Sequence, residues 1–507
     1  MQGQEPFWGD IHTHTNLSDG NGSPEGNLDI AESHLDFWAM ADHAYHEGVF
    51  SIDYRKLGPG RCLLNDHWSQ VQQLCRAYEK PGQFVPFLAY EWTNFRYGHH
   101  NVYYLDYDQP IRMPLTLPEL YESLRGVQAF VIPHHGGYPV GICGKDWSCH
   151  DDLLSPCVEI YSVHGSSEEP TGIQPLLTSG SWMGPGASGG SVQEGLARGY
   201  RLGIMASSDS HGEHPGAYDN GLMAVYAEEL TRRSLWDAFR SRRIYGVTGD
   251  RILLDFQING HPMGSSFRCS DSRAINVWVV GWDKVERVDI IKNNVVLRSF
   301  VSPTGNPRAG EGGLRFRFMI EWGWDVLAEH DWDGCLKIAG GKVRQAIPCF
   351  RGSVASRAGK GIVRLTDREC TWRSKTEKPH GWRHCRGAAD ALAFEVGCDE
   401  DAQMQLTFAC DGLKRQLLIP AAEALNRTTV AYMEDVPPTD DGAYWHNMKS
   451  YAKVKVHQAW LTEHLSLDLR HEDGPGERFG DRSDFYYVRV LQRNGGRAWS
   501  SPIWVGQ

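Results

Sequence analysis

The side chains best able to carry chemistry are histidines and carboxylates that follow short apolar runs in the first half of the chain. Fourteen of the 22 histidines lie within residues 1–250, and most of them stand beside Gly, Asp, Ser or another His. Histidines that only fill a core would not favour such places, whereas metal ligands on loops at strand ends would. The candidates, in chain order, are His12, His14, Asp19, His43, Glu91, His134, His135, His164, Asp209 and His211.

The segments that must position these side chains alternate between strands and helices. Runs that are apolar on both faces predict buried parallel strands after an initial FWGDI strand, at residues 36–41, 84–90, 129–133, 157–161, 202–206 and 222–226. Helix-like stretches lie between them at residues 24–34, 66–79, 117–124, 192–198 and 231–240. Repeated strand–helix units favour an α/β fold, and six or seven of them fit a closed or nearly closed barrel.

The candidate residues share one position in this pattern, just after a strand. Each group alone has an ordinary structural explanation: Asp42-His43 could be a surface or capping pair, and Asp209 could be a helix N-cap. Chemistry in such barrels collects at the C-terminal ends of the strands, so six groups at that end favour a metal site. A catalytic zinc needs three protein ligands, whereas this larger set could hold two or three ions. Nitrogen and oxygen ligands without thiolate suit Mn, Zn or Fe.

The order of these motifs resembles the PHP (polymerase and histidinol phosphatase) superfamily. The matching segments are GDIHTHTNLSDG near the N-terminus, ADH at 41–43 and SSDSH at 207–211, and the resemblance covers about residues 6–250. It implies a distorted seven-stranded (β/α) barrel with a trinuclear metal centre. Two further segments, residues 91–106 and 486–505, look like a branch with a C-terminal β-rich region that is grouped as a domain of unknown function. His99 and Asn101 fall on the pattern of that branch.

The resemblance also implies a ligand set for each ion. The first ion would be held by His12, His14, Glu91 and Asp209. The second would be held by Glu91, His134 and His164, and the third by Asp19, His43 and His211. Glu91 would bridge the first two ions. His135 could replace His134, although His134 fits the motif better.

This ligand set predicts a metal-dependent hydrolase whose nucleophile is a metal-bridging hydroxide. Its substrate would be a phosphate mono- or diester of a small organic molecule. The alternative is a hydrolase or lyase acting on another bond at the same centre, such as a glycoside, sulfate ester or carboxylic ester. A non-catalytic metal- or sugar-binding protein would be favoured only if ligands were missing. The predicted catalytic residues are Glu91, His99, Arg96 and His135, with His100 and Lys145 as further candidates for contacting the substrate.

Two loops rich in Gly and aromatic residues, at 134–152 and 165–191, are expected to wall the pocket. Trp92, Tyr97, Trp147 and Trp182 lie on or near the active-face loops and would suit an aryl or sugar ester. Each could equally be a packing residue, and Arg96 and Lys145 could equally be surface charges.

The second half of the chain changes to period-two strands. The expected organisation is a barrel domain at 1–250, a β-sandwich-like domain at 251–350 and a further β-rich region at 351–507. Turn pairs at Asn259-Gly260 and Asn293-Asn294 predict hairpins. Residues 352–400 show little periodicity, and a loop at 433–450 could reach the barrel mouth. A stabilising or oligomerising role is preferred for this half over carbohydrate binding.

Composition narrows the partners. The chain of 507 residues has 51 Lys and Arg against 63 Asp and Glu, a net charge of −12, and this argues against gripping nucleic-acid phosphates. A hydrophobic fraction of 41% excludes general disorder, and no apolar run is long enough to span a membrane. The N-terminus lacks a signal pattern, which slightly favours the cytoplasm over export with a removed signal peptide. The 12 cysteines form no regular framework, so reduced thiols are favoured, although a disulfide among Cys370, Cys385, Cys398 and Cys410 stays open.

Overall fold

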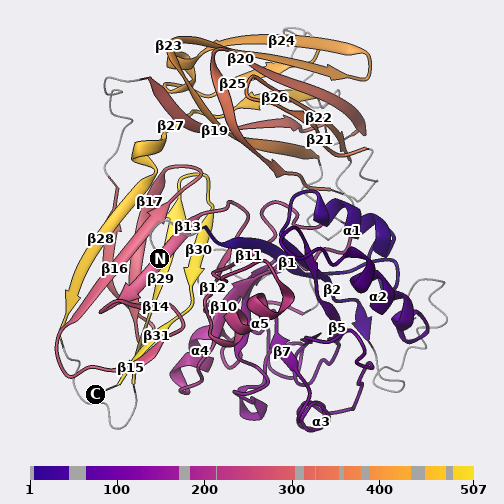
Figure 1. Ribbon diagram of the computed structural model, residues 1–507, viewed down its shortest axis with the longest axis vertical. Coiled ribbons are helices and arrows are strands. Elements are labelled where there is room, and N and C mark those ends of the chain that lie inside the picture. The colour runs from indigo at the N-terminus through magenta and orange to yellow at the C-terminus, as the bar shows by residue number, and fades with distance from the viewer. Residues whose placement is uncertain are drawn as a thin grey trace, which may run out of the picture. The chain divides into compact units, whose positions relative to one another are not determined.

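A computed structural model describes most of the chain: residues 5–44, 64–170, 183–212, 214–302, 313–325, 327–352, 359–377, 388–434, 451–474 and 483–506. The protein has a mixed α/β structure in which strands predominate (Figure 1). The chain divides into two compact units. Unit 1 comprises Met1–Gly281, Val285–Ser302 and Ser466–Gln507, and unit 2 comprises Trp282–Lys284 and Pro303–Leu465.

The first half of unit 1 has the alternating strands and helices that the sequence predicts. The predicted apolar runs form β1 (Phe7–Thr13), β2 (Phe37–Met40), β4 (Val85–Pro86), β5 (Leu88–Trp92), β7 (Ala129–Pro133), β8 (Cys157–Ser162), β10 (Gly203–Ala206) and β11 (Leu222–Val225). The predicted helices are α1 (Pro24–Glu32), α2 (Leu64–Tyr78), α3 (Leu117–Ser123), α4 (Val192–Ala197) and α5 (Arg232–Arg240). Local sequence signals set several helix starts: Thr116 and Ser191 both make capping boxes with a glutamate three residues later.

These strands do not form the single parallel sheet that the sequence predicts. β1, β2 and β4 are parallel, but β11 and β12 (Ile244–Val247) continue their sheet in antiparallel order. A second sheet has the order β3 (His43–Ala44), β5, β6 (His100–Tyr104), β7, and a third contains β10, β8 and β9 (Gly165–Ser166). β6 lies between β5 and β7 and is antiparallel to both, because the chain doubles back in a hairpin after β5. The described strands of the first half of unit 1 therefore lie in three sheets, and they show no closed barrel.

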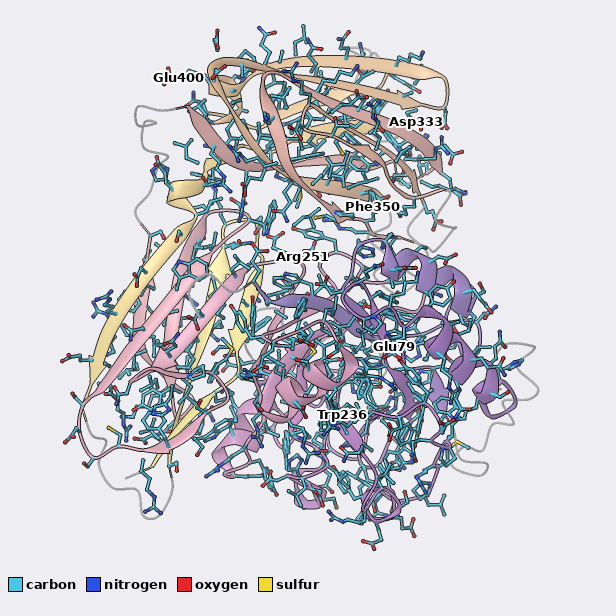
Figure 2. The ribbon with its side chains drawn as sticks, in the orientation of Figure 1. Glu79, Trp236, Arg251, Asp333, Phe350 and Glu400 are labelled. Carbon is cyan, nitrogen blue, oxygen red and sulfur yellow. The ribbon has the colours of Figure 1, made fainter. Side chains whose placement is uncertain are left out.

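The apolar residues of these strands and helices pack into several buried clusters. Trp236 of α5 is fully buried and stacks on Phe130 of β7 with ring centroids 3.9 Å apart (Figure 2). Phe87 and Phe239 complete this cluster. The packing fixes α5 against the sheets, and so holds the strands that carry the candidate residues.

The C-terminal strands of the chain return to unit 1. β28 (Ser466–Asp473) pairs with β16 (Arg273–Val280), which pairs with β13 (Leu253–Ile258), and β14 (His261–Pro262) completes that sheet. β29 (Asp484–Gln492) pairs with β17 (Val285–Lys292), and β18 (Val295–Val301) pairs with β17 in turn. β30 (Arg497–Ser500) joins β12, while β31 (Ile503–Gly506) pairs with β15 (Ser266–Arg268). The two units therefore do not follow the linear order of three consecutive segments.

Both predicted hairpin turns are confirmed. Asn259 and Gly260 have φ angles of 50° and 79°, and Asn293 and Asn294 have φ angles of 50° and 65°. Two consecutive left-handed residues are the signature of the tight turns that suit twisted hairpins.

Unit 2 is a β-sheet structure with one short helix. Its strands are β19 (Leu314–Gly323), β20 (His330–Cys349), β21 (Gly361–Leu365), β22 (Glu369–Thr376), β23 (Ala389–Cys410), β24 (Leu413–Pro420), β25 (Thr429–Tyr432), β26 (Lys453–Val456) and β27 (Trp460–Leu461), with α6 at Ala421–Ala424. Trp322, Trp372, Phe394 and Phe408 make ring contacts in its core. β21, β22 and the first part of β23 fall in residues 352–400, so the sequence analysis missed them. The loop at 433–450 lies almost entirely outside the described residues.

Two expectations about the chain as a whole can be compared with the described residues. None of the described helices is long and apolar enough to cross a membrane. Cys370, Cys398 and Cys410 are thiols and form no disulfide, as the favoured prediction has it; Cys385 lies outside the described residues.

One ion-pair cluster in unit 2 predicts a pH-dependent stability. The Glu321 carboxylate forms ion pairs with His457 Nε2 at 2.5 Å, Arg351 Nη1 at 3.2 Å and Lys455 Nζ at 3.9 Å. Burial alone would raise the pKa of the Glu321 carboxyl, but these three groups outweigh it and lower that pKa to about 2 from 4.5. A lowered pKa stabilises the fold above pH 4.5, and this contribution is lost as the pH falls toward 2; the difference corresponds to roughly 3 kcal/mol.

Glu321→Gln should therefore lower the melting temperature of the full chain at pH 7, and the gap to wild type should shrink as the pH falls from 4.5 to 2.5. Calorimetry of both proteins across that range measures the gap. A gap that stays constant with pH would show that the ionised carboxylate does not stabilise the fold.

Candidate metal centre

The first candidate segment, HTHT at the end of β1, is held in place by backbone bonds to the SSDSH segment. Asp209 N donates to His12 O at 2.8 Å, and His14 N donates to Ser210 O at 2.7 Å. Buried Asp10 adds a further connection, because it accepts hydrogen bonds from Ser208 N at 3.0 Å and Gly216 N at 2.8 Å. Two segments almost 200 residues apart in sequence thus lie side by side, and their histidines and Asp209 face the same space.

Asp42 fixes the loop that carries Asp19. Its carboxylate accepts hydrogen bonds from Thr15 N at 2.7 Å and Ser18 Oγ at 2.6 Å. Gly20 is required at the turn, because a Cβ there would lie 2.5 Å from the carbonyl of His14. The aspartate of the Asp42-His43 pair is therefore structural, and it orders the loop around the next residue group.

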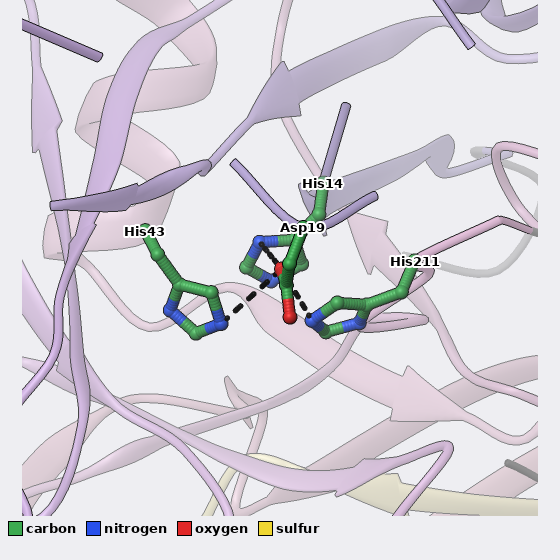
Figure 3. Close-up of side chains that lie close together, drawn as sticks. All are labelled: His14, Asp19, His43 and His211. Carbon is green, nitrogen blue, oxygen red and sulfur yellow. Dashed lines mark ion pairs between the residues drawn. The ribbon is translucent and has the colours of Figure 1, made fainter. Parts of the chain in front are cut away.

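Asp19 lies among three histidines from three separate segments (Figure 3). Its Oδ1 is 3.3 Å from His211 Nε2, 3.6 Å from His43 Nε2 and 4.0 Å from His14 Nδ1. Ligand atoms of these four residues all lie within 4.8 Å of one another, a spacing that could hold a metal ion. The rings of His14 and His211 stack with centroids 3.9 Å apart.

Glu91 presents its two oxygens to different sets of histidines. Oε1 is 2.7 Å from His99 Nδ1 and 2.8 Å from His134 Nε2. Oε2 is 2.8 Å from His43 Nδ1 and 3.5 Å from His14 Nε2. Glu91 is fully buried in β5, so its position is fixed by the sheet. A carboxylate arranged in this way can bridge two metal ions.

Asp209 is a further carboxylate that contacts histidines of this cluster. Its Oδ1 is 3.2 Å from His14 Nε2 and 3.4 Å from His12 Nε2, while its Oδ2 is 3.0 Å from His164 Nε2. Asp209 has a φ of 51°, a left-handed conformation that is uncommon for residues other than glycine. Such backbone angles cluster at functional sites, where they direct a side chain that the surrounding structure needs.

The potential metal-holding groups of unit 1 overlap one another. Besides the Asp19 group, they are Glu91 with His99, His134 and His135; His12 with His134 and Asp209; and His12 with His14 and Glu91. His12, His14, Glu91 and His134 each belong to two groups. Several buried histidine, glutamate and aspartate side chains could therefore hold metal ions next to one another.

Not every predicted residue falls within these groups. His164 lies beside Asp209, and its Nδ1 is 3.0 Å from the hydroxyl of Tyr138. The group that contains both Glu91 and His134 includes His99 and His135 and does not include His164. Arg96 is exposed and makes a cation–π contact with Tyr97, with its guanidinium 5.3 Å from the ring centroid. His100 and Lys145 are buried together, with Lys145 Nζ 3.1 Å from His100 Nε2.

The aromatic residues that the sequence assigned to the pocket are mainly packing residues. Trp92 and Trp147 are 2% and 1% exposed, and their indole N–H groups donate to the carbonyls of Pro114 and Ser191. Trp182 lies outside the described residues. Neither buried tryptophan offers a free face to a substrate.

Sequence reasoning missed Glu159. This residue lies in the middle of β8 and is 1% exposed; its Oε2 is 3.0 Å from His12 Nδ1. A carboxylate behind an imidazole fixes the ring orientation and leaves the opposite nitrogen facing the metal, an arrangement that is usual at metal centres. The signal that could have revealed it is a single acidic residue within the otherwise apolar run CVEIY.

The electrostatics of the cluster fit a site built for cations. Burial alone would raise the pKa of Glu91, but the charges of His43, His134 and His99 lower it well below its usual range. Burial lowers the pKa of His134 to about 3, and burial raises the pKa of Glu159 to about 7. The imidazole of His134 is therefore neutral at physiological pH, which is the form that binds metals. At His43, by contrast, Glu91 and Asp19 outweigh burial and raise the pKa to about 9, so a metal bound there would displace a proton.

An incompletely satisfied atom also fits the binding of an ion. His135 Nδ1 is buried and makes no hydrogen bond, and His135 has a φ of 35°. A buried polar atom without a partner costs free energy, and a ligand at that position would remove this cost. The residues present thus match the donor set of a metal centre in both chemistry and placement.

Comparisons with known proteins place the chain near proteins of unknown function. Residues 215–261 match a family described as "Protein of unknown function (DUF3604)". The chain is 33% identical over 164 residues to an uncharacterized protein of Chlamydia pneumoniae, a match that covers 29% of this chain and 26% of that protein. An uncharacterized protein of Chlamydia trachomatis is also 33% identical, over 165 residues. The chain thus spans about a quarter of the length of these relatives.

Solved structures offer only weak likenesses. The pilus backbone RrgB from Streptococcus pneumoniae has a TM-score of 0.11 and 8% identity, covering 50% of this chain and 57% of that one. The major pilin subunit BcpA of Bacillus cereus has a TM-score of 0.10 and 8% identity, covering 51% of this chain and 66% of that one. Scores this low carry no argument about fold or function.

Proposed function

We propose that unit 1 is a metal-dependent hydrolase of the PHP type that acts on a phosphate ester of a small organic molecule. The observation that carries the proposal is the overlap of the donor groups, in which Glu91 turns one oxygen toward His99 and His134 and the other toward His43 and His14. Overlapping groups suit two or three neighbouring ions better than one. In this proposal the strands of the first half of unit 1, which lie in three sheets, are the walls of a distorted barrel.

The geometry supports a ligand assignment for each ion. One ion would be held by His12, His14, Glu91 and Asp209, and a second by Glu91, His134 and a further histidine. The third would be held by Asp19, His43 and His211, to which the structure adds His14. For the second ion, His99 and His135 are the histidines grouped with Glu91 and His134. His164, which the sequence assigned to this ion, contacts Asp209.

When bound, such ions would lower the pKa of a water toward neutrality and neutralise charge on the ester oxygens. Protein groups around the ions would orient the histidine ligands and transfer protons. Glu159 orients His12 through its Nδ1, and Thr93 Oγ1 lies 2.7 Å from His43 Nδ1. Tyr138 OH, 3.0 Å from His164 Nδ1, can move a proton toward or away from a leaving group near Asp209.

The chain's net charge of −12 would repel an anionic substrate at long range. Recognition of a phosphate ester would therefore depend on the cation-binding centre itself, with Arg96 as an exposed group that could contact the substrate. This requirement makes turnover strictly dependent on metal.

A set of p-nitrophenyl compounds that differ only in the bond cleaved tests the proposal. The full chain, purified without chelator and supplied with Mn²⁺, should hydrolyse p-nitrophenyl phosphate, and chelation should abolish turnover until Mn²⁺ is restored. The matched compounds are p-nitrophenyl sulfate, acetate and glycosides, which share the leaving group. Turnover of one of these in place of the phosphate would support the alternative bond, and turnover of none would favour a non-catalytic metal-binding protein.

A further inference from the structure

Unit 2 contains a second group of potential ligands that the proposed hydrolase does not use. His330, Cys410 and Asp411 each offer a ligand atom, and these atoms all lie within 4.8 Å of one another. Among the described groups of this kind, this one alone includes a sulfur. All three residues belong to unit 2, so the group is separate from the centre of unit 1.

The fold of unit 2 fixes the three residues at one end of its sheet. His330 is the first residue of β20 and Cys410 is the last residue of β23, and these two strands pair with Trp332 opposite Cys410. Asp411 and Gly412 form the tight turn from β23 to β24, with φ angles of 46° and 88°. Regular strand pairing and a two-residue turn therefore define the site, which gives it the rigid support that a metal site needs.

His330 is held between two carboxylates. Its Nδ1 lies 2.6 Å from Asp411 Oδ2, and its Nε2 lies 2.9 Å from Asp325 Oδ2. A neutral imidazole has one N–H and can donate to only one of the two. If Nε2–H donates to Asp325, Nδ1 turns a lone pair toward Asp411, and either a second ring proton or a cation beside these two atoms would remove the repulsion. Asp325 then has the orienting role of the carboxylate behind a metal-binding histidine.

Cys410 supplies the observation that distinguishes a metal from a proton at this position. Its side chain is 2% exposed, and its Sγ lies within 4.8 Å of a ring nitrogen of His330 and of a carboxylate oxygen of Asp411. A proton bound to His330 needs no thiol nearby. A thiolate, an imidazole and a carboxylate form a donor set typical of Zn²⁺, with a fourth position left for water.

We infer that His330, Cys410 and Asp411 bind one Zn²⁺ ion that joins the start of β20 to the β23–β24 turn. None of the described ligands of the unit 1 centre takes part, so this ion is independent of the proposed hydrolase. Asp411 is the most exposed of the three, so the ion would enter from its side.

Cobalt substitution tests the inference on the full chain. Metal-free protein titrated with Co²⁺ should develop a near-ultraviolet thiolate-to-cobalt charge-transfer band that reaches its maximum at one bound equivalent for this site. The nitrogen and oxygen donors of the unit 1 centre cannot give this band, so it should persist in Glu91→Gln. Absence of the band in the wild-type chain would overturn the inference.

Cysteine variants assign the band to its sulfur. Cys410→Ser should abolish it, whereas Cys398→Ser, which replaces another buried thiol of the same strand, should retain it. Cys143→Ser should also retain it; this thiol is 3.8 Å from His99 Nε2 and is the other candidate source of a sulfur ligand. A band that survives Cys410→Ser or disappears in Cys143→Ser would contradict the inference.

A fourth variant keeps the test valid if Cys410→Ser does not fold. Asparagine accepts the left-handed conformation of the turn, so Asp411→Asn should preserve the hairpin while it removes the carboxylate. We expect the Co²⁺ affinity measured from the band to fall by about tenfold or more. An unchanged affinity would show that Asp411 is not a ligand and would refute the site as described.

Discussion

Replacing Glu91 by glutamine should remove most of the bound metal from unit 1 and lower kcat/KM by about a thousandfold or more, since the metals contribute several kcal/mol to transition-state stabilisation. The substitution keeps the shape of the side chain but removes its charge. Both oxygens of Glu91 face histidines at 2.7–2.8 Å, so this one carboxylate contacts His43, His99 and His134. Elemental analysis and the p-nitrophenyl phosphate assay measure the two effects.

A matched variant separates this effect from the general cost of changing a buried glutamate. Glu168 is also buried in unit 1, where it accepts hydrogen bonds from Tyr487 OH at 2.7 Å and Trp499 Nε1 at 2.9 Å and pairs with Arg489. Glu168→Gln should lower stability while it leaves the metal content unchanged. If Glu91→Gln keeps both metal and activity, Glu91 does not bridge ions.

Replacing Glu159 by glutamine is the second large change that the structure predicts. Glu159 Oε2 lies 3.0 Å from His12 Nδ1, and its Oε1 lies 3.7 Å from His134 Nδ1. Removing a carboxylate that supports metal-binding histidines typically costs 10- to 100-fold in metal affinity. Glu159→Gln should therefore bind Mn²⁺ about 10- to 100-fold more weakly, with activity recovered at high Mn²⁺ concentration.

Recovery by added metal is the readout that a merely structural role would not give. Competition with a chelator of known affinity measures the change, and the unfolding temperature without metal shows whether the fold has been affected. An Mn²⁺ affinity equal to that of wild type would show that Glu159 does not support the centre.

The elements of unit 1 could be predicted because their signals are local. Apolar runs such as residues 129–133 and capping residues such as Ser23 act within a few positions of the chain, and they locate β7 and α1 closely. The pairing of those strands could not be predicted in this way. β6 was hidden in an expected loop, because its first two residues, His100 and Asn101, are polar and leave an apolar run of only Val102–Tyr104.

The return of the C-terminal strands to unit 1 depends on contacts between distant residues. β29 pairs with β17 across about 200 residues of intervening chain, and nothing in the local pattern of either strand identifies its partner. In unit 2, β22 has clean alternation of buried and exposed residues, but the buried positions include Ser374 and Thr376 as well as Cys370 and Trp372. Polar residues in the buried register concealed this strand from a hydrophobicity pattern.

Much of the candidate site could be predicted because its residues occupy strand ends. The structure brings together His14, Asp19, His43 and His211, which the sequence assigned to one region from three separate motifs. Glu159 was missed because it lies in the middle of a strand rather than at its end, although it is the one acidic residue of an otherwise apolar run. The closeness of His99 and His135 to Glu91 depends on the antiparallel pairing of β5, β6 and β7, whose register the sequence does not reveal.

The central claim is that the centre in unit 1 holds at least two ions that share Glu91. Its most direct test is the Mn²⁺ content of the full chain after loading and removal of unbound metal, because Mn²⁺ prefers oxygen and nitrogen donors and does not favour the thiolate group of unit 2. We predict two or three equivalents in the wild-type chain and a loss of at least one in Glu91→Gln. Fewer than two equivalents in the wild-type chain would contradict the claim.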